Sequence, residues 1–154
     1  MRTRQPRLGP AGPQPGGGHE LRIYLVEDHP VMRQALAEFL GFARGVTVTG
    51  AAASAEEALA SLAEVDANVI LVDLSLPGMN GIDLVSAIRA RRPDLACVVY
   101  TGHGQSHYVA EALAAGARGY LLKGDPEDLL TGLRRIARGE MYVTSSLRRG
   151  ESVD

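Results

Sequence analysis

Four apolar stretches of the sequence each run into a side chain that can take part in chemistry. They are residues 23–26 before Glu27 and Asp28, residues 69–72 before Asp73, residues 97–100 before Thr101, and residues 120–122 before Lys123. Continuous apolar runs of this length are typical of strands buried on both faces of a parallel sheet. The carboxyl ends of such strands share one edge of the sheet, where α/β proteins bind their ligands. We therefore expect these acidic, hydroxyl and ammonium groups to converge.

A group of carboxylates at one sheet edge requires a positive partner. Two carboxylates about 4 Å apart repel by roughly 4 kcal/mol at an effective dielectric constant of about 20. Oxygen ligands without histidine or cysteine favour Mg²⁺, which binds carboxylates together with phosphate oxygens. A metal ion, a hydroxyl and an ammonium around one carboxylate are the parts that stabilise a transferring phosphoryl group. Asp73 would then be the acceptor and form an aspartyl phosphate.

Lys123 has an argument of its own. It is the only lysine among the 16 basic residues of the chain, which otherwise uses arginine. An ammonium is a compact point charge, whereas a guanidinium is a planar fork. The single lysine falls at the one strand end where the predicted site needs a compact charge, and this supports its assignment to the site.

The elements that must position these residues alternate along the chain as five strands and five helices. Right-handed crossovers wind this pattern into an open, doubly wound parallel sheet of α/β class. The strictly alternating residues 46–49 indicate an edge strand with one solvated face. The flavodoxin-like strand order 2-1-3-4-5 places that strand at an edge and brings Asp28 and Asp73 face to face.

The predicted helices differ in how much apolar surface they offer. Pro30 opens the first, with an apolar stripe that includes Met32 and Phe39. The fourth helix is rich in alanine and ends at Gly116, and we expect it to be the least firmly packed. Asp125 caps the fifth.

Composition bounds the organisation of the chain. Its 154 residues support a single folded domain, placed at residues 20–141 between a flexible Pro/Gly-rich tail (1–19) and a C-terminal tail (142–154). The net charge of -2 gives no basic excess for direct nucleic-acid binding. No apolar run is long enough to span a membrane, and no signal-peptide core follows the N-terminus, so we expect a cytoplasmic protein.

Two histidines lie near the predicted site. His103 follows the third buried strand after Thr101, and His107 comes shortly after it. No third ligand has a spacing suitable for a metal site with them. We therefore expect solvated loop and helix positions for both.

The chain resembles the receiver domain of two-component response regulators over residues 20–142. The resemblance is carried by four motifs: Glu-Asp-His-Pro at 27–30, Asp-Leu-Ser-Leu-Pro-Gly-Met-Asn-Gly at 73–81, Tyr-Thr-Gly at 100–102, and Gly-Tyr-Leu-Leu-Lys at 119–123. The His-Pro pair and the sequence at 138–142 resemble the subgroup that is usually fused to a helix-turn-helix DNA-binding domain. The resemblance leaves open whether this chain is a free-standing receiver or part of a longer protein.

The resemblance implies a role for each site residue. Asp73 accepts a phosphoryl group from a phosphohistidine on a sensor histidine kinase. Mg²⁺ is bound by Asp28 and Asp73 directly, by the backbone carbonyl of Ser75, and by Glu27 through water. Thr101 and Lys123 contact the phosphoryl oxygens, and Thr101 and Tyr120 form the switch.

The implied function is signalling rather than enzymatic, because the domain assists only its own phosphorylation and dephosphorylation. The switch is expected to change the face formed by the fourth helix, fifth strand and fifth helix, which a second copy or a downstream protein can bind. A nucleotide-binding enzyme would need a glycine-rich loop in place of residues 27–30. A phosphatase of the haloacid dehalogenase type would need an acid at Ser75. The alternative that remains is a pseudo-receiver, which binds proteins without being phosphorylated.

Overall fold

The computed structural model describes residues 20–148. The strands are β1 (Leu21–Val26), β2 (Val46–Ala52), β3 (Val69–Val72), β4 (Ala96–Thr101), β5 (Gly119–Leu122) and β6 (Tyr142–Val143). The helices are α1 (Pro30–Gly41), α2 (Ala55–Ser61), α3 (Gly81–Arg91), α4 (Ser106–Ala115), α5 (Pro126–Ala137) and α6 (Ser145–Arg148), with a short 3-10 helix, η1 (Leu62–Glu64).

All neighbouring strands of the sheet are parallel. Their order is β2-β1-β3-β4-β5-β6, which confirms the predicted order 2-1-3-4-5 and places the alternating strand β2 at one edge. β6 is an addition to the five predicted strands, and it pairs with β5. A strand of two residues shows no period of apolar side chains, so its position is fixed by the tertiary structure alone.

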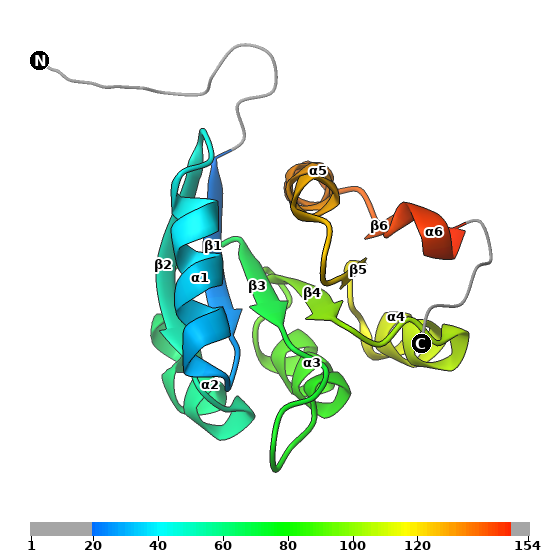
Figure 1. Cartoon of the computed structure of the whole chain (residues 1–154). Coiled ribbons are helices and arrows are strands. Elements are labelled where there is room, and N and C mark those ends of the chain that lie inside the picture. The colour runs from blue at the N-terminus through cyan, green and yellow to red at the C-terminus, as the bar shows by residue number, and fades with distance from the viewer. Residues whose placement is uncertain (1–19, 149–154) are drawn as a thin grey trace, which may run out of the picture.

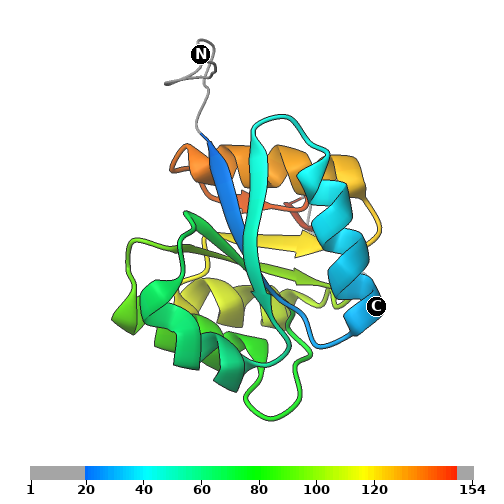
Figure 2. The same ribbon diagram turned by 90° about the vertical axis from the view of Figure 1, so that its left-hand side faces the viewer.

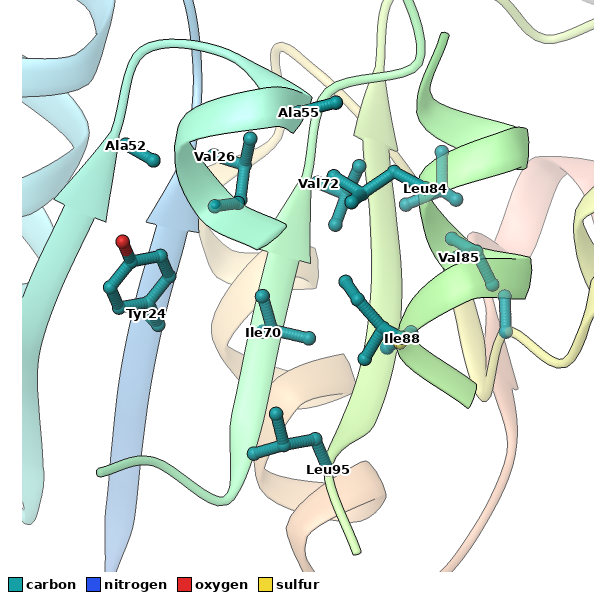
Figure 3. Close-up of a cluster of buried hydrophobic side chains, with 14 of the residues drawn as sticks. Tyr24, Val26, Ala52, Ala55, Ile70, Val72, Leu84, Val85, Ile88 and Leu95 are labelled. Atoms are coloured by element: carbon teal, nitrogen blue, oxygen red, sulfur yellow. The ribbon is translucent and has the colours of Figure 1, made fainter. Parts of the chain in front are cut away.

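Helices cover both faces of the sheet, as Figure 1 shows. α1 and α5 lie on one face, and α2, α3 and α4 lie on the other, an arrangement seen again in Figure 2. The strands between them are buried on both faces, so β3 reads as an uninterrupted apolar run. In the core on the side of α2 and α3, strand residues such as Ile70 and Val72 pack against Val85 and Ile88 of α3 (Figure 3).

The segment after α5, where a C-terminal tail was predicted from residue 142, contains two short regular elements. Tyr142 and Val143 form β6 opposite Gly119 and Tyr120, and α6 follows directly. The flexible tail predicted for residues 1–19 and the last residues, 149–154, lie outside the described part of the chain. The division into a receiver domain with two tails stays a prediction. Within residues 20–148, no helix is long and apolar enough to cross a membrane.

α1 buries only part of its apolar stripe. Leu36 and Leu40 are buried, whereas Met32 and Phe39, which share the helical spacing, are each 37% exposed. α1 packs over β1 and the edge strand β2. A helix that lies over the edge of a sheet meets less apolar surface than one over its centre, and its buried stripe is accordingly narrow.

The two helices beside β5 begin and pack differently. Asp125 caps α5 by accepting a hydrogen bond from the backbone N–H of Asp128, as its sequence predicts. Gln105 precedes α4 without a side-chain cap, and Ala112 is the one buried residue of that helix. α4 ends at Gly116, whose φ of 114° lies in the left-handed region that favours glycine. The light packing predicted for α4 is confirmed.

Candidate functional site

The ends of β1 and β3 bring three carboxylates together. The backbone N–H of Asp73 donates to the carbonyl oxygen of Val26 at 3.0 Å, which places the residues after the two strands side by side. One carboxylate oxygen from each of Glu27, Asp28 and Asp73 lies within 4.8 Å of the other two. Asp28 is exposed, whereas Glu27 and Asp73 are buried. The cluster therefore opens to solvent on the side of Asp28.

Lys123 supplies positive charge on the inner side of this cluster. Its Nζ is 3.2 Å from Oδ2 of Asp73 and 3.2 Å from Oε1 of Glu27. The Lys123 backbone N–H donates to the carbonyl of Thr101 at 2.8 Å, which fixes the end of β5 against β4. Burial alone would lower the pKa of the ammonium, but the charges of Asp73 and Glu27 outweigh it and raise the pKa. Lys123 is therefore held in its charged form.

The environment of Glu27 disfavours its charged form. Its side chain is almost fully buried, and this burial raises the pKa of the carboxyl group. The backbone N–H of His29, which donates to Oε2 at 3.1 Å, and the charge of Lys123 act in the opposite direction, while Asp73 raises the pKa further. The net shift of the Glu27 pKa is upward, with burial as its largest cause. A second cation near Asp28 would stabilise the ionised cluster.

The loop after β3 holds Asp73 in a defined orientation. Oδ1 accepts a hydrogen bond from the backbone N–H of Ser75 at 3.1 Å, while Oδ2 faces Lys123. The loop returns to Gly81, whose N–H donates to the Leu74 carbonyl at 3.1 Å. A Cβ at position 81 would lie 2.4 Å from the carbonyl oxygen of Asp73. Because real side chains do not approach backbone this closely, glycine is required for α3 to begin directly behind the acceptor residue.

Thr101 and Tyr120 meet at a common neighbour. Both are fully buried. The Thr101 hydroxyl oxygen accepts a hydrogen bond from the backbone N–H of His103 at 3.3 Å, and the Tyr120 hydroxyl donates to the backbone carbonyl of His103. The two residues predicted to act as a switch are therefore connected through the loop between β4 and α4.

His103 is the site residue that sequence reasoning missed. The side chain is exposed, as expected for a loop position, but its Nε2 lies 2.9 Å from the hydroxyl oxygen of Ser75. Nothing in the sequence around Gly102 and Gly104 predicts this contact, because the two residues belong to loops after different strands. Among residues 20–148, the acidic and imidazole side chains placed closely enough to hold a metal ion are those of Glu27, Asp28 and Asp73.

The edge of β5 is covered. β6 pairs with β5, and buried Thr144 accepts a hydrogen bond from the Leu122 N–H at 2.8 Å and donates its own N–H to the Tyr120 carbonyl at 2.9 Å. Leu147 of α6 packs against the apolar core on the α4 side of the sheet. The face predicted for partner binding is therefore formed by α4 and α5 together with β6 and α6.

Comparison with known proteins assigns the chain to a family. The sequence model described as "Response regulator receiver domain" matches residues 23–134. The nitrate/nitrite response regulator protein NarL of Escherichia coli K12 is 36% identical over 126 residues, which are 81% of this chain and 58% of NarL. The response regulator UvrY of the same strain is 29% identical over 128 residues, covering 82% and 59% of the two chains.

Solved structures give the same result. A two-component response regulator of the LuxR family from Aurantimonas sp. SI85-9A1 has a TM-score of 0.80 and 30% identity, with 84% of this chain and 93% of that chain covered. The isolated REC domain of RcsB from Salmonella enterica serovar Typhimurium, solved with the phosphomimetic BeF3-, has a TM-score of 0.78 and 27% identity, with 84% and 97% covered.

These matches confirm the predicted family and subgroup. The chain spans less than two thirds of the curated relatives NarL and UvrY, and the match falls on the part that carries the acidic cluster. The chain belongs to the receiver-domain family of response regulators.

Proposed function

We propose that this chain is a phosphorylation-dependent signalling receiver that takes a phosphoryl group on Asp73. The donor is a phosphohistidine of a sensor histidine kinase: a bond forms between an Asp73 carboxylate oxygen and phosphorus as the phosphorus–nitrogen bond of the donor breaks. The observation that carries the proposal is the meeting of Glu27, Asp28 and Asp73 with the ammonium of Lys123. That set leaves one reactive carboxylate surrounded by charge-stabilising groups.

The donor set fits Mg²⁺. All ligand atoms offered by the cluster are carboxylate oxygens, which suit a small hard cation. In this proposal Asp28 and Asp73 bind the ion directly, the Ser75 carbonyl completes the protein ligands, and Glu27 acts through water. When bound, the ion supplies neutralisation of the charge on the transferring group.

The other site residues are proposed to bind the phosphoryl oxygens or to transmit the change at Asp73 to the protein surface. Lys123, already 3.2 Å from Oδ2 of Asp73, is placed to hold a phosphoryl oxygen by its charge. The Thr101 hydroxyl is proposed to bind a second oxygen, and Tyr120 to transmit the change to the surface formed by α4, β5, α5 and the covering β6–α6 segment. That surface is where we place a homodimer contact or a downstream protein. The same residues assist phosphorylation and dephosphorylation of the domain itself.

Phosphorylation with a small-molecule donor tests the proposal. Acetyl phosphate and Mg²⁺ should add one phosphoryl group to the wild-type chain, measured by intact-mass spectrometry, and hydroxylamine should remove it as expected for an acyl phosphate. Asp73→Asn should stay unmodified, because an amide oxygen is a poor nucleophile. A wild-type protein that never gains mass under these conditions contradicts the proposal and favours the pseudo-receiver.

A second measurement tests the metal site without any phosphoryl transfer. Asp28→Asn should abolish the rise in melting temperature that Mg²⁺ gives the wild-type protein. The same change should stabilise the metal-free protein by about 1 kcal/mol, because it relieves repulsion between carboxylates. Thermal melts with and without Mg²⁺ measure both effects, with Ca²⁺ as a control for ion size. Equal Mg²⁺-induced shifts in the two proteins would exclude Asp28 as a ligand.

The wider role of the protein follows from its relatives only as a proposal. RcsB has been solved as two dimers bound to two parallel DNAs, and NarL is named a response regulator for nitrate and nitrite. We propose that the receiver described here likewise controls an output that lies outside it, through a partner or a further domain. The net charge of -2 supplies no basic excess for phosphate contacts, so we propose no direct nucleic-acid contact for this chain.

A further inference from the structure

The side chain of His103 joins the two loops that flank the site. It lies in the loop between β4 and α4, and its Nε2 is 2.9 Å from the Ser75 hydroxyl oxygen in the loop after β3. This is an ordinary hydrogen-bond length. The backbone N–H of Ser75 in turn donates to Oδ1 of Asp73 at 3.1 Å. A continuous line of contacts therefore runs from the acceptor carboxylate to His103.

The main chain of His103 continues that line to the buried tyrosine. Its carbonyl oxygen accepts the hydrogen bond from the Tyr120 hydroxyl, and its N–H donates to the Thr101 hydroxyl oxygen at 3.3 Å. Tyr120 is fully buried, and burial raises the pKa of its hydroxyl, so the protonated form is the donor. A buried hydroxyl without an acceptor is costly. The position of the His103 backbone thus determines whether Tyr120 is stable in its present, inward orientation.

The backbone is held differently on the two sides of His103. Gly102 is exposed, and a Cβ there would have no heavy atom within 4 Å, whereas Gly104 is buried and forms a single β-bridge. The glycine at position 102 leaves the backbone on that side with wide conformational freedom. The anchors of the His103 side chain are the hydroxyl of Ser75 and an edge contact with the Tyr108 ring, whose centroid lies 5.7 Å away.

We propose that His103 is a positioning residue whose hydrogen bond to Ser75 couples the loop that carries Asp73 to the inward orientation of Tyr120. The inference rests on the proposed function for its meaning in signalling. The coupling itself is a property of the unphosphorylated protein and can be measured there. Phosphorylation changes the acceptor oxygen that Ser75 contacts, and this change reaches Tyr120 through the imidazole.

A double-mutant cycle tests the coupling in the unphosphorylated chain. The variants are His103→Ala, Ser75→Ala and the double mutant, and the readout is the Tyr120 ring resonance in protein labelled with ¹³C-tyrosine. Each single change should lower the inward-to-outward equilibrium constant of Tyr120 about fivefold, the equivalent of one hydrogen bond of about 1 kcal/mol. Because both remove the same bond, the double mutant should resemble the single mutants. Additive effects, or no effect of His103→Ala, would overturn the proposal.

His107→Ala is the matched control. His107 is also exposed, and its ring centroid lies 4.1 Å from that of Tyr108, but within the described residues its side chain makes no hydrogen bond to the loop after β3. This variant removes an imidazole near Tyr108 without breaking the proposed link, so Tyr120 should be unaffected. An effect as large as that of His103→Ala would mean that any change near the start of α4 alters the Tyr120 orientation. The specific role proposed for His103 would then be rejected.

A second arm uses the phosphorylated protein. Wild type, His103→Ala and His107→Ala are phosphorylated with acetyl phosphate and compared at equal phosphorylated fractions by mass spectrometry and NMR. The factor by which phosphorylation changes the inward-to-outward equilibrium constant of Tyr120 should be about fivefold smaller in His103→Ala than in the other two. Equal shifts would overturn the proposal. If the wild type takes no phosphoryl group, the proposed function fails, whereas the double-mutant cycle still decides the coupling.

Discussion

α4 and α5 both pack beside β5, yet they are anchored very differently. α5 buries Leu129, Gly132, Leu133 and Ile136 and begins at a capped Asp125, whereas α4 buries Ala112 and begins at Gln105 without a side-chain cap. The acidic cluster connects through His103 to the loop that precedes α4, and through Lys123 to the end of β5, two residues before the Asp125 cap of α5. α4 buries fewer residues than α5 and is therefore easier to displace, so we expect phosphorylation to move α4 more than α5.

The largest expected difference between the helices comes from matched leucines. Leu133 of α5 is fully buried and Leu113 of α4 is half-buried. Leu133→Ala should lower the free energy of unfolding by about 2–5 kcal/mol, because it leaves a cavity in the core. Leu113→Ala should cost about 1 kcal/mol or less, since less surface returns to water. Urea denaturation of both variants makes the measurement, and equal losses would remove the basis of the comparison.

Amide hydrogen exchange compares the local stability of α4 and α5 in the intact protein. The amides of α4 should open with a free energy about 1–3 kcal/mol below that of α5, because local opening there exposes little apolar surface. Beryllofluoride, which stands in for the phosphoryl group on Asp73, should change exchange mainly in α4 and the residues that cover β5. α2 and α3 serve as internal controls, and changes confined to those two helices would refute the proposed switch face.

The smallest expected effects come from the helix caps. Asp125→Ala should destabilise the protein by about 1 kcal/mol through loss of the hydrogen bond to the Asp128 N–H. Gln105→Ala should be nearly neutral, and Gln105→Ser should add a cap to α4 and stabilise the protein by roughly 0.5 kcal/mol. Thermal melts measure all three. A Gln105→Ala loss as large as that of Asp125→Ala would show that α4 is anchored at its start by a contact other than a cap.

Sequence patterns predicted the parts of this molecule that depend on local chemistry. Glu27, Asp28, Asp73 and Lys123 each follow an apolar run that identifies a buried parallel strand. The carboxyl ends of such strands share one edge of the sheet, so the meeting of these residues was predictable. The light packing of α4 followed from its alanine content. Each of these features is encoded in neighbouring residues.

The features that sequence reasoning missed depend on contacts between distant segments. The pairing of His103 with Ser75 joins two loops, and neither loop contains a sign of the other. Met32 and Phe39 have helical spacing, but their exposure depends on the position of α1 over β1 and the edge strand β2. β6 is too short for any periodic pattern and is held by Thr144 and by its pairing with β5.

The short strand β6 also bears on the solubility of the domain. An open edge of a sheet presents unpaired N–H and carbonyl groups that recruit strands of other molecules and lead to aggregation. β6 pairs with Gly119 and Tyr120 of β5, and the Thr144 side chain accepts the hydrogen bond of the Leu122 N–H before the chain enters α6. On this side the sheet thus ends in an edge too short to template another chain. A protein cut after residue 141 would expose β5 in its place, so residues 142–148 protect this edge against strand pairing with other molecules.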